Sequence, residues 1–157
     1  MADAAAVQVW KDVTDQLNAR QGGWSQSFKA SRKYKPKAKF EEVDQVVVQT
    51  ALSAWRVSQD NRTDWAHQFD VDIGILYRPP GKAGDQPVEK YDSLLKLAEE
   101  ITDYWETTRA ANADCPLTAI RFGPAPDAPW IPEWIEEHNC FASVITLTFW
   151  KLRDPNG

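Results

Sequence analysis

Apolar residues recur at helical spacing in two stretches of the chain. The first stretch is residues 4–20, with an apolar stripe at Ala6, Trp10, Val13 and Leu17. The second stretch is residues 88–110, with a stripe at Tyr91, Leu94, Leu95, Ala98, Ile101 and Trp105. A spacing of three and four positions places such side chains on one face of a helix. The pattern therefore predicts two amphipathic helices, each burying one face.

Other stretches alternate between apolar and polar residues, as strands with one buried face do. The clearest is 65–77, whose apolar parity holds Trp65, Phe69, Val71, Ile73, Ile75 and Tyr77. Residues 45–58 are rich in β-branched residues, and the polar turn at 60–64 joins them to 65–77, which predicts a long β-hairpin. Further strands are predicted at 24–34, 117–122 and 139–150. The last of these is apolar on both parities, which favours a central position in the sheet.

The order of predicted elements indicates the fold class. Helices separated by blocks of strands favour an α+β fold, here a mainly antiparallel β-sheet flanked by helices. The length of 157 residues suits one domain, 1–157. Two segments interrupt the periodic patterns: a basic loop or arm at 29–44 and a Pro- and Trp-rich loop at 123–138.

Composition excludes several classes of protein. A hydrophobic fraction of 43% with eight Trp is incompatible with a disordered chain. No apolar run approaches the length of a membrane span, and the start MADAAAV lacks the features of a secretory signal. Two cysteines, Cys115 and Cys140, cannot make a disulfide framework. We therefore expect an intracellular protein with reduced thiols.

Charge is unevenly distributed along the chain. The net charge is −5, yet residues 29–39 hold six basic residues and no acidic one, which leaves 12 basic against 23 acidic residues elsewhere. The basic residues are Lys29, Arg32, Lys33, Lys35, Lys37 and Lys39. Acidic residues gather on the exposed side of the second predicted helix, among them Asp92, Glu99, Glu100, Asp103 and Glu106. The basic stretch is a solvated loop, an arm that contacts duplex DNA without reading its sequence, or an arm that contacts the acidic helix of a neighbouring copy.

Few residues could support catalysis or bind a metal. His67 lies in a predicted strand, where a histidine facing water or a sheet edge is the simpler interpretation. His138 and Cys140 have no further His or Cys partners to complete a zinc site. Asp70 and Asp72 share a strand face and could bind a cation, but an exposed polar face explains them more simply. The sequence therefore predicts a protein that is not an enzyme and needs no cofactor or metal.

Seven of the eight tryptophans fall into two groups. Most lie on apolar stripes or strands and are predicted core residues: Trp10, Trp24, Trp65, Trp105 and Trp150. Trp130 and Trp134 lie in the Pro-rich segment instead. They either pack onto the core of the same chain or anchor a partner, because buried Trp is common at interface hot spots. The sequence leaves both interpretations open.

Taken together, these features resemble a known family. A helix leads into a strand with a basic, aromatic loop, a hairpin ends in FDVDIGILYR, a helix reads EKYDSLLKLAEEITDYW, and the chain closes with FASVITLTFWKLR. This order is similar to that of the tail terminator proteins of long-tailed bacteriophages, also called tail completion or tail-to-head joining proteins. The resemblance covers approximately residues 5–152. The Pro- and Trp-rich loop at 123–135 is longer than the pattern of the family.

The resemblance implies a structural role in the virion, in the tail or neck, with assembly in the host cytoplasm. Copies would form a hexameric ring that caps the tail tube, stops its polymerisation and offers a docking face to the neck or connector protein. In contractile tails the ring would also meet the sheath protein. DNA would pass through the lumen without sequence-specific binding, and the family has no catalytic residues to carry over. The alternatives are another neck or minor tail component, such as a stopper or adaptor, and a DNA-contacting module that uses residues 29–39.

Overall fold

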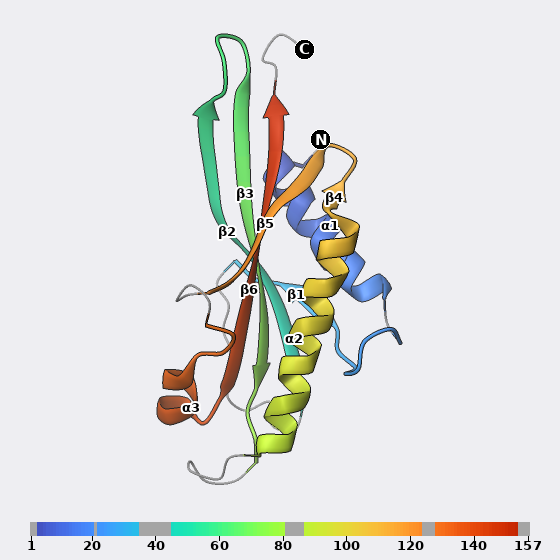
Figure 1. The fold of residues 1–157 in the computed structure, drawn as a ribbon, viewed down its shortest axis with the longest axis vertical. Coiled ribbons are helices and arrows are strands. Elements are labelled where there is room, and N and C mark those ends of the chain that lie inside the picture. Colours follow the sequence, from blue (N-terminus) through green and yellow to red (C-terminus); the bar gives the residue numbers. More distant parts are fainter. Residues whose placement is uncertain (1–2, 21, 35–44, 81–86, 124–127, 154–157) are drawn as a thin grey trace.

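The computed structural model describes residues 3–20, 22–34, 45–80, 87–123 and 128–153. Within these residues the elements are α1 (Ala5–Ala19), β1 (Ala30–Arg32), β2 (Val47–Gln59), β3 (Trp65–Tyr77), α2 (Val88–Thr108), β4 (Ala110–Asn112), β5 (Cys115–Gly123), α3 (Pro132–His138) and β6 (Phe141–Arg153). The strands form one sheet in the order β1-β2-β3-β6-β5-β4, and only the β1–β2 pair is parallel. The α+β class with a mostly antiparallel sheet is confirmed (Figure 1).

The middle of the sheet is built from three long strands. β2 pairs antiparallel with β3, and β3 pairs with β6 along its whole length, from Trp65 opposite Arg153 to Tyr77 opposite Phe141. β6 also pairs with β5 on its other side, so the prediction of a central closing strand is confirmed. Both faces of a strand in this position are largely shielded, which suits the buried Phe149 on one parity and the buried Ala142 on the other.

One face of the sheet, which we call the helix face, packs against α1 and α2 (Figure 1). The helix face includes Phe69 and Phe149, and the largest fully buried side chains also include Trp10 of α1 and Trp105 of α2. The Trp10 indole donates a hydrogen bond from Nε1 to Thr50 Oγ1 at 2.9 Å, which links α1 to β2. The predicted stripes of both helices are therefore the faces that build the core.

The segment 123–138 is not a loop throughout, because residues 132–138 form helix α3. Pro132 suits the first helical turn, where its missing N–H needs no partner. Glu133 in the first turn complements the helix dipole. Asn139 then ends the helix in the left-handed conformation with φ 48°, which asparagine tolerates better than most residues.

The predicted strand 24–34 is largely irregular, and only Ala30–Arg32 joins the sheet. The buried positions are as predicted, since Trp24, Phe28 and Ala30 are all shielded from solvent. The Trp24 indole donates to the carbonyl of Leu17, and both backbone groups of Ala30 bond the side chain of Asn18. Contacts with the end of α1 therefore hold this segment, and strand pairing is confined to Ala30–Arg32.

Two tryptophans predicted for the core lie elsewhere. Trp65 is 41% exposed, because it begins β3 at the end of the sheet that extends beyond the helices. Trp150 is half-buried and lies on the face opposite the helices, since it pairs with Gln68 rather than with a residue of the helix face. The other three, Trp10, Trp24 and Trp105, are buried as predicted.

Candidate functional site

The sheet face opposite α1 and α2 carries a polar network centred on Asp70. The Asp70 side chain is only 2% exposed, and Arg56 donates to both of its carboxylate oxygens at 2.9 and 2.8 Å. Arg121 donates to Oδ2 at 3.1 Å, and the hydroxyl of Thr148 donates to Oδ1 at 2.8 Å. The expectation of an exposed Asp70 is therefore wrong. Long arginine side chains from β2 and β5 cover the carboxylate, which the sequence pattern of β3 alone could not indicate.

The electrostatics of this network keep Asp70 ionised. Burial raises the pKa of the carboxyl, but the hydrogen bonds from Arg56, Thr148 and Arg121 outweigh it, so the pKa lies below its ordinary value. Both guanidinium groups are about half exposed. A buried carboxylate bound by two partly solvated cations joins four strands of the sheet.

Asp72 is the next polar residue on the same face. Its Oδ1 accepts hydrogen bonds from the hydroxyls of Ser53 at 3.0 Å and Thr146 at 2.7 Å. In the part of the chain that the structure describes, no group of three or more His, Cys, Asp or Glu side chains is placed to hold a metal ion. The partners of Asp70 and Asp72 indicate a role in holding the sheet together.

The helix face carries an exposed apolar patch where β2 and β3 extend beyond the helices. We call it the ribbon patch; it consists of Trp55, Val57, Trp65 and His67. Trp55 is 50% exposed and Val57 is 52% exposed. The Trp55 indole donates from Nε1 to Nδ1 of His67 at 3.0 Å, and its ring also lies against Phe69. His67 thus helps to orient the exposed indole.

Sequence reasoning missed Trp55 for a physical reason. A bulge between Leu52 and Ala54 shifts the register of β2 against β3. A bulge adds one residue to one strand, so the parity that faces the helices changes along β2. Before the bulge the even positions Val48 and Thr50 are buried on the helix face, and after it the odd position Trp55 lies opposite Phe69. No simple alternation can reveal that change.

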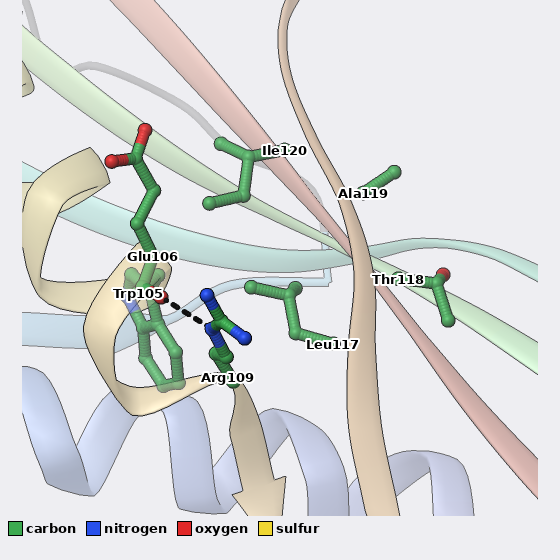
Figure 2. A pocket seen from close by; sticks show the side chains of 7 residues that line it. All are labelled: Trp105, Glu106, Arg109, Leu117, Thr118, Ala119 and Ile120. Atoms are coloured by element: carbon green, nitrogen blue, oxygen red, sulfur yellow. Dashed lines mark hydrogen bonds between the residues drawn. The ribbon is translucent and has the colours of Figure 1, made fainter.

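A groove of about 540 Å³ lies between the end of α2 and β5. We call it the α2–β5 groove; Trp105, Glu106, Arg109, Leu117, Thr118, Ala119 and Ile120 line it. Figure 2 shows Leu117 and Ile120 on the side of β5 that faces α2, with the Arg109 guanidinium between Leu117 and the helix. Arg109 ends α2 in the left-handed conformation, and its Nε donates to the carbonyl of Glu106 at 3.1 Å. The groove thus combines apolar side chains, Leu117 and Ile120, with the charged side chains of Glu106 and Arg109.

The acidic residues expected on the second helix lie on its outer surface with one exception. The exposed ones are Asp92, Glu99, Asp103 and Glu106. Glu100 is half-buried, and its Oε1 accepts a hydrogen bond from the backbone N–H of Ser25 at 2.8 Å. Glu100 therefore joins α2 to the segment after α1, and the other four remain candidates for contact with a partner.

The basic stretch is described only in part. Lys29, Arg32 and Lys33 are exposed, whereas Lys35, Lys37 and Lys39 lie outside the described residues. The Arg32 guanidinium carbon lies 5.0 Å from the centre of the Trp10 ring, and the backbone N–H of Lys33 donates to the carbonyl of Thr50. These contacts hold the beginning of the stretch against α1 and β2.

The two tryptophans of the Pro-rich segment differ in how far they are exposed to solvent. Trp130 is 39% exposed, whereas Trp134 is half-buried in α3 with its ring against His138. The backbone N–H of Ile131 donates to the carbonyl of Ala142, which ties this segment to β6. Trp130 is the better placed of the two to contact a partner.

No protein-family model matches this sequence, and comparison with curated proteins gave no match. The surfaces described above are therefore the basis for the functional argument. The ribbon patch and the α2–β5 groove both lie on the helix face of the sheet. In the order of strands they lie toward opposite edges, the patch near β2 and the groove near β5. Among the described helices, none is both long and apolar enough to cross a membrane.

Proposed function

We propose that this protein is a structural ring component of the phage tail terminator type. In this proposal copies form a hexameric ring that caps the tail tube, stops its polymerisation and provides the docking interface to the neck or connector protein. The observation that carries the proposal is a pair of different surfaces toward opposite edges of one sheet, the ribbon patch near β2 and the groove near β5. A closed ring needs such a pair, because each subunit meets its two neighbours through unlike surfaces.

The chemistry of the two surfaces supports a head-to-tail contact. One side of the sheet offers exposed apolar side chains at Trp55 and Val57, and the other offers the α2–β5 groove with acidic residues of α2 nearby. In this proposal β2 and β3 act as one long β-hairpin that reaches toward the next copy. Opposite charges outside the apolar contact, such as the exposed Lys29 and Glu99, add steering and register more than affinity.

The proposal also assigns the partners. The ring binds the tail tube protein on one side and a neck or connector protein on the other, and it meets the sheath protein in a contractile tail. DNA passes through the lumen without sequence-specific binding, in a protein located in the tail or neck of the virion. Trp130 is a candidate anchor for one of these partners because it is exposed on a segment tied to β6.

The test is the mass of the purified protein in solution and its effect on tail tubes. We expect a hexamer, or a mixture of monomer and hexamer that shifts toward monomer with salt, because exposed charge pairs are screened over about 8–10 Å at 0.1–0.15 M salt. Added to polymerising tube protein, it should bind tube ends and limit tube length. A protein that stays monomeric and leaves tube growth unchanged would contradict the proposal.

Two other outcomes would favour the alternatives. Binding to a connector protein without binding to tube ends would indicate a stopper or adaptor. Tight binding to duplex DNA that weakens steeply with salt would indicate a DNA-contacting module. In that case charge reversal at Lys29, Arg32 and Lys33 should weaken binding strongly, because these residues are half of the six cations of the basic stretch.

A further inference from the structure

We propose that the ribbon patch of one copy inserts into the α2–β5 groove of the next copy, so that β2 of one copy extends the sheet of its neighbour beyond β5. This inference rests on the proposed function, because it specifies the contact through which the ring closes. It names a second copy of this chain as the occupant of the groove. The argument depends on strand register, on strand edges and on side-chain chemistry.

The two surfaces lie at the same level of the sheet. Trp55 pairs with Phe69, Phe69 pairs with Phe149, and Phe149 pairs with Leu117, so these four residues form a row across the sheet. The next row runs through Leu52, Val71, Leu147 and Ile120. If neighbouring copies are related by rotation about an axis parallel to the strands, residues of the same row lie at the same height in every copy. Such an axis brings Trp55 of one copy to Leu117 of the next.

The directions and faces of the strands also match. β2, β3, β6 and β5 are antiparallel in succession, so β2 and β5 run in opposite directions. A β2 strand placed beside β5 of the next copy therefore continues the antiparallel order. Trp55 and Leu117 both lie on the helix face, opposite Phe69 and Phe149. The added strand thus turns its apolar side chains toward the groove and not away from it.

Each of these two strands has an outer edge that, among the described residues, is paired over only part of its length. β1 pairs only with Val48, Gln49 and Thr50, and no other described strand pairs with the outer edge of β2 from Ala51 to Gln59. On the other side β4 pairs with Cys115 and Pro116, and the backbone N–H of Leu117 donates to the carbonyl of Arg109 at 2.7 Å. From Thr118 to Gly123 no described strand covers the outer edge of β5. Unpaired edge strands are natural templates for a strand from another chain.

The side chains of the two surfaces are complementary. An exposed Trp beside an exposed Val is an unusual apolar patch, which often marks an interface. The groove is shallow and supplies the apolar side chains of Leu117 and Ile120, which an inserted apolar side chain would cover. The Arg109 guanidinium at its wall offers a cation to the face of an indole. Trp55 is therefore suited to be the central anchor of the contact.

The decisive experiment mixes two variants that each lack one surface. Trp55→Asp removes the ribbon patch and leaves the groove, and Ile120→Lys blocks the groove and leaves the patch. We expect each variant alone to associate at least about thirtyfold more weakly than the unmodified chain, as for the loss of an interface hot spot. Mixed in equal amounts, they should form a dimer of one copy each and nothing larger, because only one complementary pair of surfaces remains.

Control variants keep the test interpretable. Val88→Asp changes a valine that is 61% exposed at the start of α2, away from both surfaces, and should leave the mass unchanged. Circular dichroism and urea unfolding show whether each variant is folded. If either of the first two variants is unfolded, Val57→Asp and Arg109→Glu replace them, since both positions are exposed.

Three results would overturn the inference: an unmodified chain that stays monomeric at its highest soluble concentration, folded single variants that keep the unmodified mass, or a mixture that forms no dimer. Failure of the proposed function is a separate result. A chain that passes the mixing test but neither binds tube ends nor limits tube length would form this contact in some other assembly. A patch that binds only the tube protein would count against a second copy as the occupant.

Discussion

Arg56 and Asp70 are joined across two strands although they are not directly opposite each other. Asp70 pairs with Ala54 and Arg56 pairs with Gln68, so the two residues are diagonal neighbours. The guanidinium nonetheless reaches both carboxylate oxygens, a bidentate geometry that only arginine provides. Because Arg121 binds the same carboxylate from β5, one buried acidic group links the two outer parts of the sheet.

The first prediction concerns the loss of these cations. Arg56→Ala alone should lower the free energy of unfolding by about 1 kcal/mol, because Arg121 and Thr148 still bind Asp70. Arg56→Ala combined with Arg121→Ala should cost about 3–5 kcal/mol, since it leaves a buried carboxylate without a cation. Urea unfolding measures both. Arg62→Ala, in the exposed turn before β3, is the matched control and should have little effect. A double variant no less stable than Arg56→Ala would contradict this account.

The second prediction concerns pH. The folded state holds the pKa of Asp70 below its ordinary value, so the ionised carboxyl stabilises the fold at neutral pH. This stability is present above the unfolded pKa of about 3.9 and is lost as pH falls through the folded pKa. The difference in free energy of unfolding between the unmodified chain and Asp70→Asn should therefore shrink as pH falls from 7 to about 3. A difference that stays constant over this range would show that Asp70 does not titrate with folding.

The third prediction concerns the buried bond between Trp10 and Thr50. The hydroxyl of Thr14 donates to the carbonyl of Trp10, so its contact with Thr50 Oγ1 at 2.7 Å uses the proton of Thr50. Thr50→Val removes the acceptor of the Trp10 indole in a fully buried site and should cost about 1–3 kcal/mol in urea unfolding. Thr50→Ser keeps the hydroxyl and should cost less. Equal losses in both variants would indicate that packing, not the hydrogen bond, matters here.

The fourth prediction concerns Cys115 and Cys140. Both thiols are buried, and burial raises the pKa of each. A thiol-specific reagent should therefore modify the folded protein at least about a hundredfold more slowly than the unfolded protein, because reaction requires thiolate and access. Mass spectrometry should find two labels after unfolding and almost none before. Rapid labelling of either cysteine in the folded protein would mean that its surroundings open readily.

The parts of the fold that were predictable are those with strict periodicity. Alternation over residues 65–77 predicted β3 with the same bounds as the structure, and the helical stripe ending at Trp105 predicted α2 within two residues at its end. A regular spacing specifies which side chains share a face, and the core then selects that face. Three-residue β4 carries too few positions for any pattern, and the proline content of 123–138 concealed α3.

The candidate surfaces were less predictable. Four of the five acidic residues singled out on α2 could be placed on its outer side from sequence, because the stripe of the helix fixes its opposite face, whereas Glu100 is half-buried. The ribbon patch could not, since a bulge reverses the parity of β2 before Trp55. The α2–β5 groove depends on where α2 ends relative to β5, which no local pattern specifies.

The sequence by itself determined the secondary structure of the long elements, the α+β class and the uneven charge, because each depends on local spacing or composition. Only the tertiary structure decided that Asp70 is buried under arginines of two other strands, and that Trp65 remains exposed beyond the helices. It also decided that Trp55 on β2 and Leu117 on β5 lie in the same row across the sheet, toward opposite edges. The reason is physical: burial, pairing and surface shape depend on which strands become neighbours, and those neighbours lie far apart along the chain.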